Sequence, residues 1–289
     1  MRKILAAIAA VLAVLATTAA PASADIAQPL GSAPIPAGPA PNWLIADLDS
    51  GQVLAEQNGY AVTPPASTIK VLLALVALDE LNLDDTVMAS PADTAVECNC
   101  AGIKPGRSYT TRQLLDGLLL VSGNDAANAL ADMLGGPEAA VAKMNAKAAA
   151  VGATATHAST PSGLDGPGGS GASTPHDLAA IFRAAMANPV FAEITAQHAA
   201  MFPTESGERP IVNMNELLTR YPGAFGGKTG FTDAARKTYV GAAARDGRRL
   251  VVAMMYGLIR EGGPTYWDQA AALLDWGFAQ GPMSGVGSL

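Results

Sequence analysis

Apolar and polar side chains alternate near both ends of this chain, which is the pattern of strands with one buried face. Five segments have this character: residues 42–49, 52–56, 224–232, 238–244 and 249–256. Asp49-Ser50-Gly51 and Asp246-Gly247 separate neighbouring segments and have the composition of hairpin turns. We therefore expect one antiparallel sheet assembled from both ends of the chain.

The middle of the chain is typical of helices, and a last helix follows the final strand. We expect helices at residues 111–121, 125–134, 137–151, 174–186 and 265–278. Pro137 and Gly152 stand where a helix start and a helix stop favour these residue types. The predicted fold is of the α/β class (α+β type): a central antiparallel sheet flanked by helices, with an inserted all-helical lobe and a cleft at the seam.

A further buried helix is predicted at the apolar run 71–78, which follows Pro64-Pro65. Ser67 and Lys70 lie where this helix begins and share one face of it, because they are three positions apart. The hydroxyl would lie near the positive end of the helix macrodipole, with an amine close enough to take its proton. The plainer alternative is that Ser67 caps the helix and Lys70 is solvated.

The first 24 residues have the organisation of a secretory signal peptide. Met1-Arg2-Lys3 is positive, residues 4–20 are almost wholly apolar, and Ala22-Ser23-Ala24 is a small-x-small cleavage signal. An uncleaved anchor helix is the alternative, which the short apolar run disfavours. We expect export to the periplasm or cell-wall space, with secretion left open and no integral membrane segment in the mature chain.

Composition and domain boundaries complete this outline. The 289 residues are 49% hydrophobic and 15% charged, which excludes a disordered chain. The net charge is -7 and no basic run occurs, so we expect no nucleic-acid partner. Residues 25–41 form a Pro/Ala-rich linker, residues 42–280 a single catalytic domain and residues 281–289 a flexible tail. Nothing after Phe278 predicts a second domain or an anchor helix, which implies release into the wall space.

Two cysteines, Cys98 and Cys100, are separated by one residue. In an oxidising compartment this pair can close on itself, since alpha carbons two apart can fall within reach of a disulfide. Two free thiols are the alternative. A metal site is not expected, because the histidines His157, His176 and His198 show no ligand spacing. No cofactor is implied.

Three short motifs occur once each and in a fixed order: Ser67-x-x-Lys70, Ser122-x-Asn124 and Lys228-Thr229-Gly230. Together they resemble the motifs of the penicillin-recognising serine enzymes. Their surroundings are most similar to low-molecular-mass D-alanyl-D-alanine carboxypeptidases over about residues 41–280. The matching strings are residues 65–70, 122–127, 162–166 and 227–232. The resemblance implies a β-lactamase/transpeptidase-like fold, with peptidoglycan stem peptides as substrates and β-lactams as covalent inhibitors.

The resemblance also implies how the bond between two D-alanines is attacked. Ser67 would be the nucleophile and Lys70 its base, with a pKa lowered by burial and by the like charge of Lys228. The backbone N–H groups of Ser67 and Phe231 would bind the oxyanion. Ser122 would relay the proton to the leaving amine.

Other residues would bind the substrate. Asn124 would hold Lys70 and the substrate amide. Lys228 and Thr229, in the motif completed by Gly230, would meet the terminal carboxylate. The family often adds an arginine beside this strand, and Arg260 is the nearest candidate, against the alternative of a solvated loop residue.

Several alternatives stay open at this point. Ser122 and Asn124 could cap the helix that follows, and Lys228 could be a surface residue. Class A β-lactamases add a deacylating Glu, whereas the corresponding loop, residues 157–173, has none. A wall-binding protein without turnover is another possibility. The sequence also leaves open carboxypeptidase against endopeptidase or transpeptidase activity, the third stem-peptide residue and the oligomeric state.

Overall fold

The computed structural model describes residues 26–289 except 167, 260 and 282–284. The predicted signal peptide and Arg260 therefore lie outside the described residues. An antiparallel sheet of seven strands has the order β1-β3-β2-β10-β9-β8, with β11 also beside β3. The strands of this sheet are β1 (Ile26–Ala27), β2 (Asn42–Asp47), β3 (Gln52–Gln57), β8 (Ala224–Thr232), β9 (Arg236–Arg245), β10 (Arg248–Gly257) and β11 (Gly287–Ser288).

The sheet joins the two ends of the chain, as expected. Strand β10 pairs antiparallel with β2 on one side and with β9 on the other. The strands from the end of the chain therefore lie beside the β2–β3 hairpin from its beginning. The β9–β10 turn consists of Asp246 and Gly247, both with positive φ angles, 51° and 78°. Such a pair matches the right-handed twist of the flanking strands. The hairpin predictions are thus confirmed.

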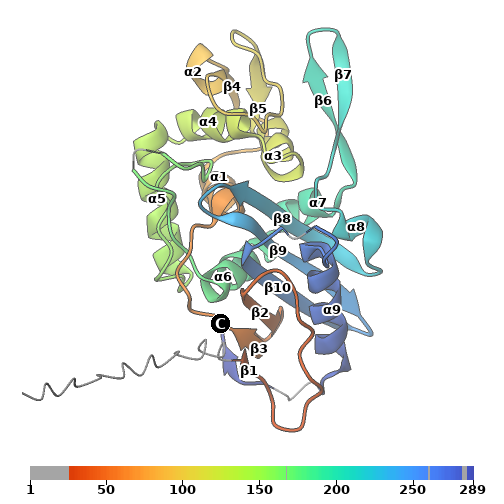
Figure 1. Ribbon diagram of the computed structural model, residues 1–289. Coiled ribbons are helices and arrows are strands. Elements are labelled where there is room, and N and C mark those ends of the chain that lie inside the picture. The colour runs from red at the N-terminus through yellow and green to blue at the C-terminus, as the bar shows by residue number, and fades with distance from the viewer. Residues whose placement is uncertain (1–25, 167, 260, 282–284) are drawn as a thin grey trace, which may run out of the picture.

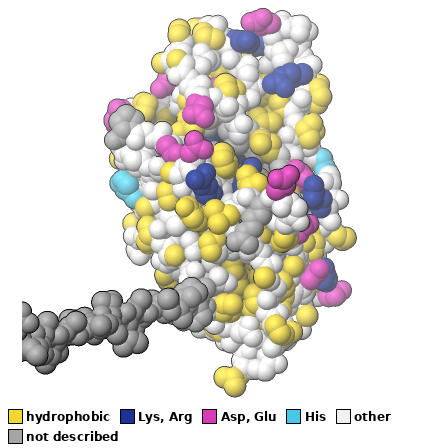
Figure 2. Space-filling model, in the orientation of Figure 1, with side chains coloured by type: hydrophobic (Ala, Val, Ile, Leu, Met, Phe, Trp, Pro, Cys, Tyr) yellow, Lys and Arg dark blue, Asp and Glu magenta, His cyan; other side chains and the backbone are white. Residues whose placement is uncertain are grey.

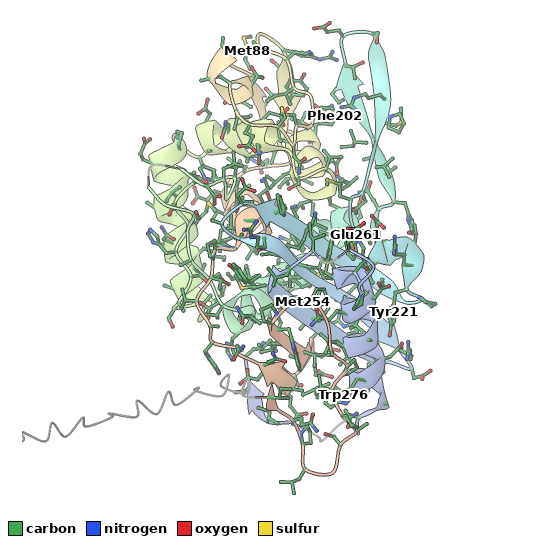
Figure 3. The ribbon with its side chains drawn as sticks, viewed as in Figure 1. Met88, Phe202, Tyr221, Met254, Glu261 and Trp276 are labelled. Atoms are coloured by element: carbon green, nitrogen blue, oxygen red, sulfur yellow. A yellow bond between two sulfur atoms is a disulfide. The ribbon has the colours of Figure 1, made fainter. Side chains whose placement is uncertain are left out.

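Helices cover both faces of the sheet (Figure 1). They are α1 (Lys70–Glu80), α2 (Pro91–Thr94), α3 (Thr111–Leu120), α4 (Asn124–Met133), α5 (Pro137–Ala150), α6 (Pro175–Met186), α7 (Pro189–Ala196), α8 (Leu217–Arg220) and α9 (Tyr266–Ala279), with a 3₁₀ turn η1 (Ala66–Ile69) before α1. Helix α9 packs on one face, in a cluster that includes Met254 and Trp276 (Figure 3). The other face packs against α6 and the helical lobe, which holds the larger core. Each predicted helix is confirmed to within a residue or two at its ends.

Smaller elements were not predicted. Strands β4 (Thr86–Met88) and β5 (Ser108–Thr110) pair at the edge of the helical lobe. Strands β6 (Ala199–Thr204) and β7 (Gly207–Val212) form a hairpin that projects beside this lobe (Figure 1). Its anchor is Phe202, which is fully buried and stacks on Tyr109 with ring centroids 5.8 Å apart (Figure 3).

The segments expected to be a linker and a flexible tail require correction, because both contact the sheet. Ile26–Ala27 and Gly287–Ser288 each pair with β3. Ala40 is buried, and Gln269 of α9 both donates to its carbonyl and accepts from its N–H. Proline-rich composition thus did not prevent packing, since side chains of α9 supply the hydrogen bonds that a strand ladder would otherwise provide.

Surface charge and helix length bear on the expected partners. Within the part of the chain that the structure describes, no helix is long and apolar enough to cross a membrane. On the face shown in Figure 2, Lys and Arg side chains are scattered among acidic ones and form no continuous patch.

Candidate active site

Ser67 and Lys70 lie on one side of a tight helical turn. Ser67 belongs to the 3₁₀ turn Ala66–Ile69, and Lys70 is the first residue of α1. Side chains three positions apart eclipse in a 3₁₀ turn, more closely than in the α-helix expected from the sequence. As a result Lys70 Nζ lies 2.7 Å from Ser67 Oγ. Both side chains are buried, with exposed fractions of 0% for Lys70 and 8% for Ser67.

The amine of Lys70 has three hydrogen-bond partners, each at 2.7 Å: Ser67 Oγ, Asn124 Oδ1 and the carbonyl oxygen of Ser162. The last two are oxygens that can only accept. A neutral amine has two N–H donors and one lone pair. Once the two acceptors take both N–H groups, the lone pair faces the only partner that can donate, the Ser67 hydroxyl. The geometry therefore suits an amine that takes the Ser67 proton.

Electrostatics favour this neutral form of Lys70. Complete burial holds its pKa well below the usual lysine value, and the nearby charge of Lys228 lowers the pKa further. Asp125 acts in the opposite direction, since its negative charge favours the ammonium. The amine therefore gives up its proton more readily than an exposed lysine does, as a general base must.

Ser122 lies between α3 and α4 in an unusual backbone conformation, with a φ angle of +60°. Its hydroxyl oxygen accepts a hydrogen bond from Lys228 Nζ at 2.8 Å. Lys228 also donates to the carbonyl oxygen of Thr229, and burial lowers its pKa to about 7. A left-handed serine costs energy and persists only where its surroundings fix it.

The alternative that Ser122 and Asn124 merely cap α4 is wrong. Helix α4 begins at Asn124, its N-cap residue is Gly123, and no side chain makes a capping hydrogen bond. The Asn124 side chain instead bonds Lys70 and the carbonyl oxygen of Glu97. The surface-residue alternative for Lys228 is also wrong, because its side chain is 1% exposed.

Strand β8 approaches the 3₁₀ turn at Gly230. A Cβ atom at this position would lie 2.3 Å from Thr238 Oγ1 and 3.0 Å from the backbone nitrogen of Ser67. Real Cβ atoms essentially never show the first distance and rarely the second, so any residue other than glycine would force the Thr238 side chain or the neighbouring backbone to shift. The close packing of Gly230 on the turn that carries Ser67 therefore brings the neighbouring residues Lys228 and Thr229 to the nucleophile.

A groove of about 290 Å³ runs beside this site. Its lining residues are Asn99, Ser122, Met214, Glu216, Thr229, Gly230, Phe231, Lys237 and Tyr266. Phe231 is 45% exposed. The structure thus brings every predicted site residue that it describes to one seam between the sheet and the helical lobe.

Sequence reasoning missed Lys237, which lies in the groove because it pairs with Phe231 in the β8–β9 ladder. Its Nζ lies 4.9 Å from the Phe231 ring centroid and 5.9 Å from that of Tyr266. Two gaps in the sequence prediction explain this: β9 was expected to begin one residue later, at Thr238, and no turn was predicted between β8 and β9 from which their register could be counted.

The two cysteines form a disulfide, so the alternative of two free thiols is wrong. Their alpha carbons are 4.8 Å apart. Among the described residues no group of His, Cys, Asp and Glu side chains could hold a metal ion. His176 stacks on Tyr60, with centroids 4.6 Å apart, and bonds the carbonyl oxygen of Ser288.

Known proteins resemble the whole of this domain. The family model for D-alanyl-D-alanine carboxypeptidases matches residues 31–257. A D-alanyl-D-alanine carboxypeptidase of Mycobacterium tuberculosis is 74% identical over 268 residues, which are 93% of this chain and 92% of that protein. Another, from a Streptomyces, is 35% identical over 232 residues, covering 74% of this chain and 78% of that protein.

Solved structures of similar sequence have the same fold as this chain. The crystal structure of a D-alanyl-D-alanine carboxypeptidase from Mycobacterium tuberculosis matches with a TM-score of 0.90 and 74% identity, covering 91% of this chain and 100% of that chain. A Streptomyces DD-transpeptidase matches with a TM-score of 0.78 and 29% identity, covering 86% of this chain and 100% of that one.

Proposed function

Because this chain belongs to the D-alanyl-D-alanine carboxypeptidase family, we propose that Ser67 is the nucleophile that attacks the carbonyl between the two terminal D-alanines of peptidoglycan stem peptides. The enzyme is a serine peptidase, a hydrolase that removes the terminal D-alanine through an acyl-enzyme. Its fold is that of the penicillin-binding proteins.

One observation carries the assignment of the base. Lys70 is fully buried, and two of its three partners, Asn124 Oδ1 and the Ser162 carbonyl oxygen, can only accept. Its lone pair therefore faces Ser67 Oγ, 2.7 Å away. Lys70 takes the hydroxyl proton as the oxygen attacks, and the positive charge that it gains is held by the same two oxygens.

The second half of acylation involves Ser122 and Lys228. The C–N bond breaks, and the leaving nitrogen takes a proton from the Ser122 hydroxyl. Ser122 then regains a proton from Lys228, which is hydrogen-bonded to it, or from the protonated Lys70. With a pKa lowered to about 7, Lys228 can give up a proton near neutral pH. Backbone N–H groups of Ser67 and Phe231 bind the oxyanion, and water then releases the shortened peptide from Ser67.

Recognition of the substrate's free carboxylate falls to the groove. Thr229, in the motif completed by Gly230, offers a hydroxyl, while Lys228 already donates to Ser122 and to a backbone oxygen. Lys237 lines the same groove, and within the described residues its ammonium makes no hydrogen bond or ion pair. We therefore add Lys237 as the cation that meets this carboxylate. The role suggested for Arg260 stays a prediction.

Intact mass after incubation with penicillin tests this proposal. The lactam imitates the D-alanyl-D-alanine end, so we expect one adduct per molecule of parent protein and none on Ser67→Ala. Far-ultraviolet circular dichroism of Ser67→Ala controls for folding. An unchanged mass with active drug, or an adduct that survives this substitution, contradicts the assignment of Ser67.

Transfer of the acyl group from Ser67 to an amine is a second candidate reaction, because a similar solved structure is a DD-transpeptidase. An acyl-enzyme on Ser67 can be released by water or by the amine of a neighbouring peptide. Incubation of a pentapeptide with and without an acceptor amine separates the two: hydrolysis yields only the tetrapeptide, whereas transfer yields a cross-linked product. A protein that binds wall peptides without turnover would release no D-alanine at all.

The place of action follows from the first residues of the sequence. We propose that residues 1–24 are a signal peptide, because a positive start, an apolar run and Ala22-Ser23-Ala24 occur in that order. The disulfide Cys98–Cys100 fits an oxidising compartment outside the cytoplasm. Amino-terminal sequencing of exported protein should begin at Asp25.

A further inference from the structure

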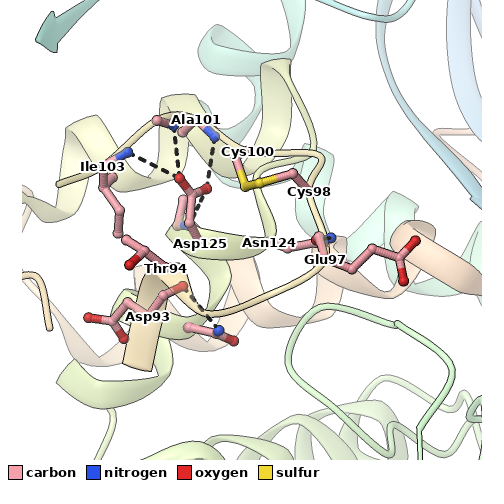
Figure 4. The surroundings of a disulfide bond; sticks show 12 residues. Asp93, Thr94, Glu97, Cys98, Cys100, Ala101, Ile103, Asn124 and Asp125 are labelled. Carbon is pink, nitrogen blue, oxygen red and sulfur yellow. Dashed lines mark hydrogen bonds between the residues drawn. A yellow bond between two sulfur atoms is a disulfide. The ribbon is translucent and has the colours of Figure 1, made fainter. Parts of the chain in front are cut away.

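The disulfide lies directly against the catalytic Asn124. Cys98 and Cys100 belong to the loop between α2 and β5, and this loop runs past the start of α4 (Figure 4). The bond closes a ring that contains only Cys98, Asn99 and Cys100. It therefore fixes the backbone on both sides of Asn99 without linking distant parts of the fold.

Two backbone carbonyls of this loop accept hydrogen bonds from Asn124, one from its backbone nitrogen and one from Nδ2. The carbonyl oxygen of Asn99, inside the ring, accepts from the Asn124 backbone N–H at 2.7 Å. The carbonyl oxygen of Glu97, next to the ring, accepts from Asn124 Nδ2 at 2.6 Å. The loop thus determines the position of the Asn124 backbone and the rotation of its amide.

The rotation of that amide determines what Lys70 contacts. With Nδ2 directed at Glu97, Oδ1 points at Lys70 Nζ, 2.7 Å away. A reversed amide would present N–H groups to the amine, and the lone-pair geometry at Ser67 would be lost.

The rest of the loop is held independently of the disulfide. The Asp125 carboxylate accepts from the backbone N–H groups of Ala101, Gly102 and Ile103 (Figure 4). Arg209, from the β6–β7 hairpin, donates to the carbonyl oxygen of Ala101. Because these contacts remain when the sulfurs separate, and because the closed ring is so short, loss of the bond should cost little global stability.

We propose that the disulfide-closed segment 97–100 is a positioning element for the reaction: it holds the Asn124 amide in the orientation that directs the lone pair of Lys70 at Ser67. The inference rests on the roles proposed above for Ser67 and Lys70. It assigns the disulfide to catalysis rather than to fold stability.

A double-mutant cycle tests this proposal. Acylation by a fluorescent penicillin is measured for the parent, for Cys98→Ser with Cys100→Ser, for Asn124→Ala, and for the combination of all three. We expect removal of the disulfide to slow acylation roughly tenfold in the parent background and less than about twofold in the Asn124→Ala background, because coupled residues are non-additive. The melting temperature should change by no more than about 2 °C.

Chemical reduction supplies the matched control. A phosphine reductant should slow the parent to the rate of the cysteine-free variant, reoxidation should restore it, and the cysteine-free variant should not respond. Equal slowing in both backgrounds, or an unchanged rate in the reduced parent, overturns the inference. Absence of any penicillin adduct on Ser67 in the oxidised parent would instead refute the proposed function.

Discussion

Lys228 Nζ lies 2.8 Å from Ser122 Oγ, although 106 residues separate the two in the chain. Lys228 comes from the sheet, on β8, and Ser122 from the helical lobe, between α3 and α4. Their hydrogen bond crosses the seam between the two parts of the fold. Docking of the lobe on the sheet therefore completes the catalytic site, and any change that separates them should abolish activity before it unfolds either part.

Lys70→Ala should lose acylation while the fold persists. Removal of a general base costs about 10²- to 10⁴-fold in rate. The cavity left by the side chain is compensated in part, since a buried amine with a lowered pKa carries its own desolvation cost. Stopped-flow acylation with penicillin measures the loss, and circular dichroism checks the fold. A full acylation rate in this variant would refute the role of Lys70.

Lys228→Met should stabilise the protein more at pH 6 than at pH 9. Burial lowers the pKa of Lys228 to about 7, from 10.5 in an exposed lysine. Below pH 7 the ammonium is charged in both states, and its burial costs folding free energy. Between pH 7 and 10.5 the unfolded chain binds the extra proton, so the stability of the parent rises with pH.

The measurement is the melting temperature of the variant minus that of the parent, at both pH values. Lys143→Met, on a partly exposed lysine that pairs with Glu80 at the surface, is the control and should show no such trend. A difference that is the same at both pH values, or larger at pH 9, would mean that the pKa of Lys228 is not lowered in the folded protein.

Gly230→Ala should inactivate the enzyme more than it destabilises it. The added methyl group would lie within 3.1 Å of the backbone nitrogens of Ser67 and Thr68, and the 3₁₀ turn would have to move. We expect acylation to fall at least about a hundredfold, since small misplacements at the reacting atoms have effects of this size. Gly166→Ala, where no atom lies within 4 Å, is the matched control and should acylate normally.

The sequence predicted what local patterns encode. Alternation, turn residues and helix caps gave the sheet, the main helices and the three motifs. The β6–β7 hairpin escaped because Pro203 and Pro210 interrupt its strands and because most of β7 is exposed, so no buried face alternates along it. Its position depends on Phe202, whose partner Tyr109 is remote in sequence.

The site was predictable as far as side-chain chemistry defines it. The role of Glu97 was not predicted because it depends on the backbone carbonyl oxygen, which accepts from Asn124, and every residue has such an oxygen. Lys237 escaped because it reaches the groove only through strand pairing. The 3₁₀ form of the turn at Ser67 was not predicted because the same residue types begin a 3₁₀ turn and an α-helix.

Thr229→Val should reduce peptide turnover more than penicillin acylation. Valine keeps the shape and the strand preference of threonine and removes only the hydroxyl. If that hydroxyl binds the terminal carboxylate, the difference between variant and parent should disappear for a substrate with an amidated terminus. Release of D-alanine, or of its amide, is the measurement. Equal turnover of both substrates by the parent enzyme would exclude carboxylate recognition altogether.

Lys237→Met should weaken recognition of the same carboxylate while Lys237→Arg largely preserves it. The ammonium lies against Phe231 and Tyr266, lines the groove with Thr229, and is the cation there that neither Ser122 nor a backbone oxygen engages among the described residues. Loss of a hydrogen bond to a charged group costs about 1.5–3 kcal/mol, so kcat/KM for the free-acid peptide should fall roughly ten- to a hundredfold. For the amidated peptide it should fall less than about twofold, because no negative charge is present to lose its partner. Arg236→Met, on the exposed neighbouring residue, controls for net charge and should behave as the parent. A fall of equal size for both peptides would assign Lys237 a packing role against the two rings instead.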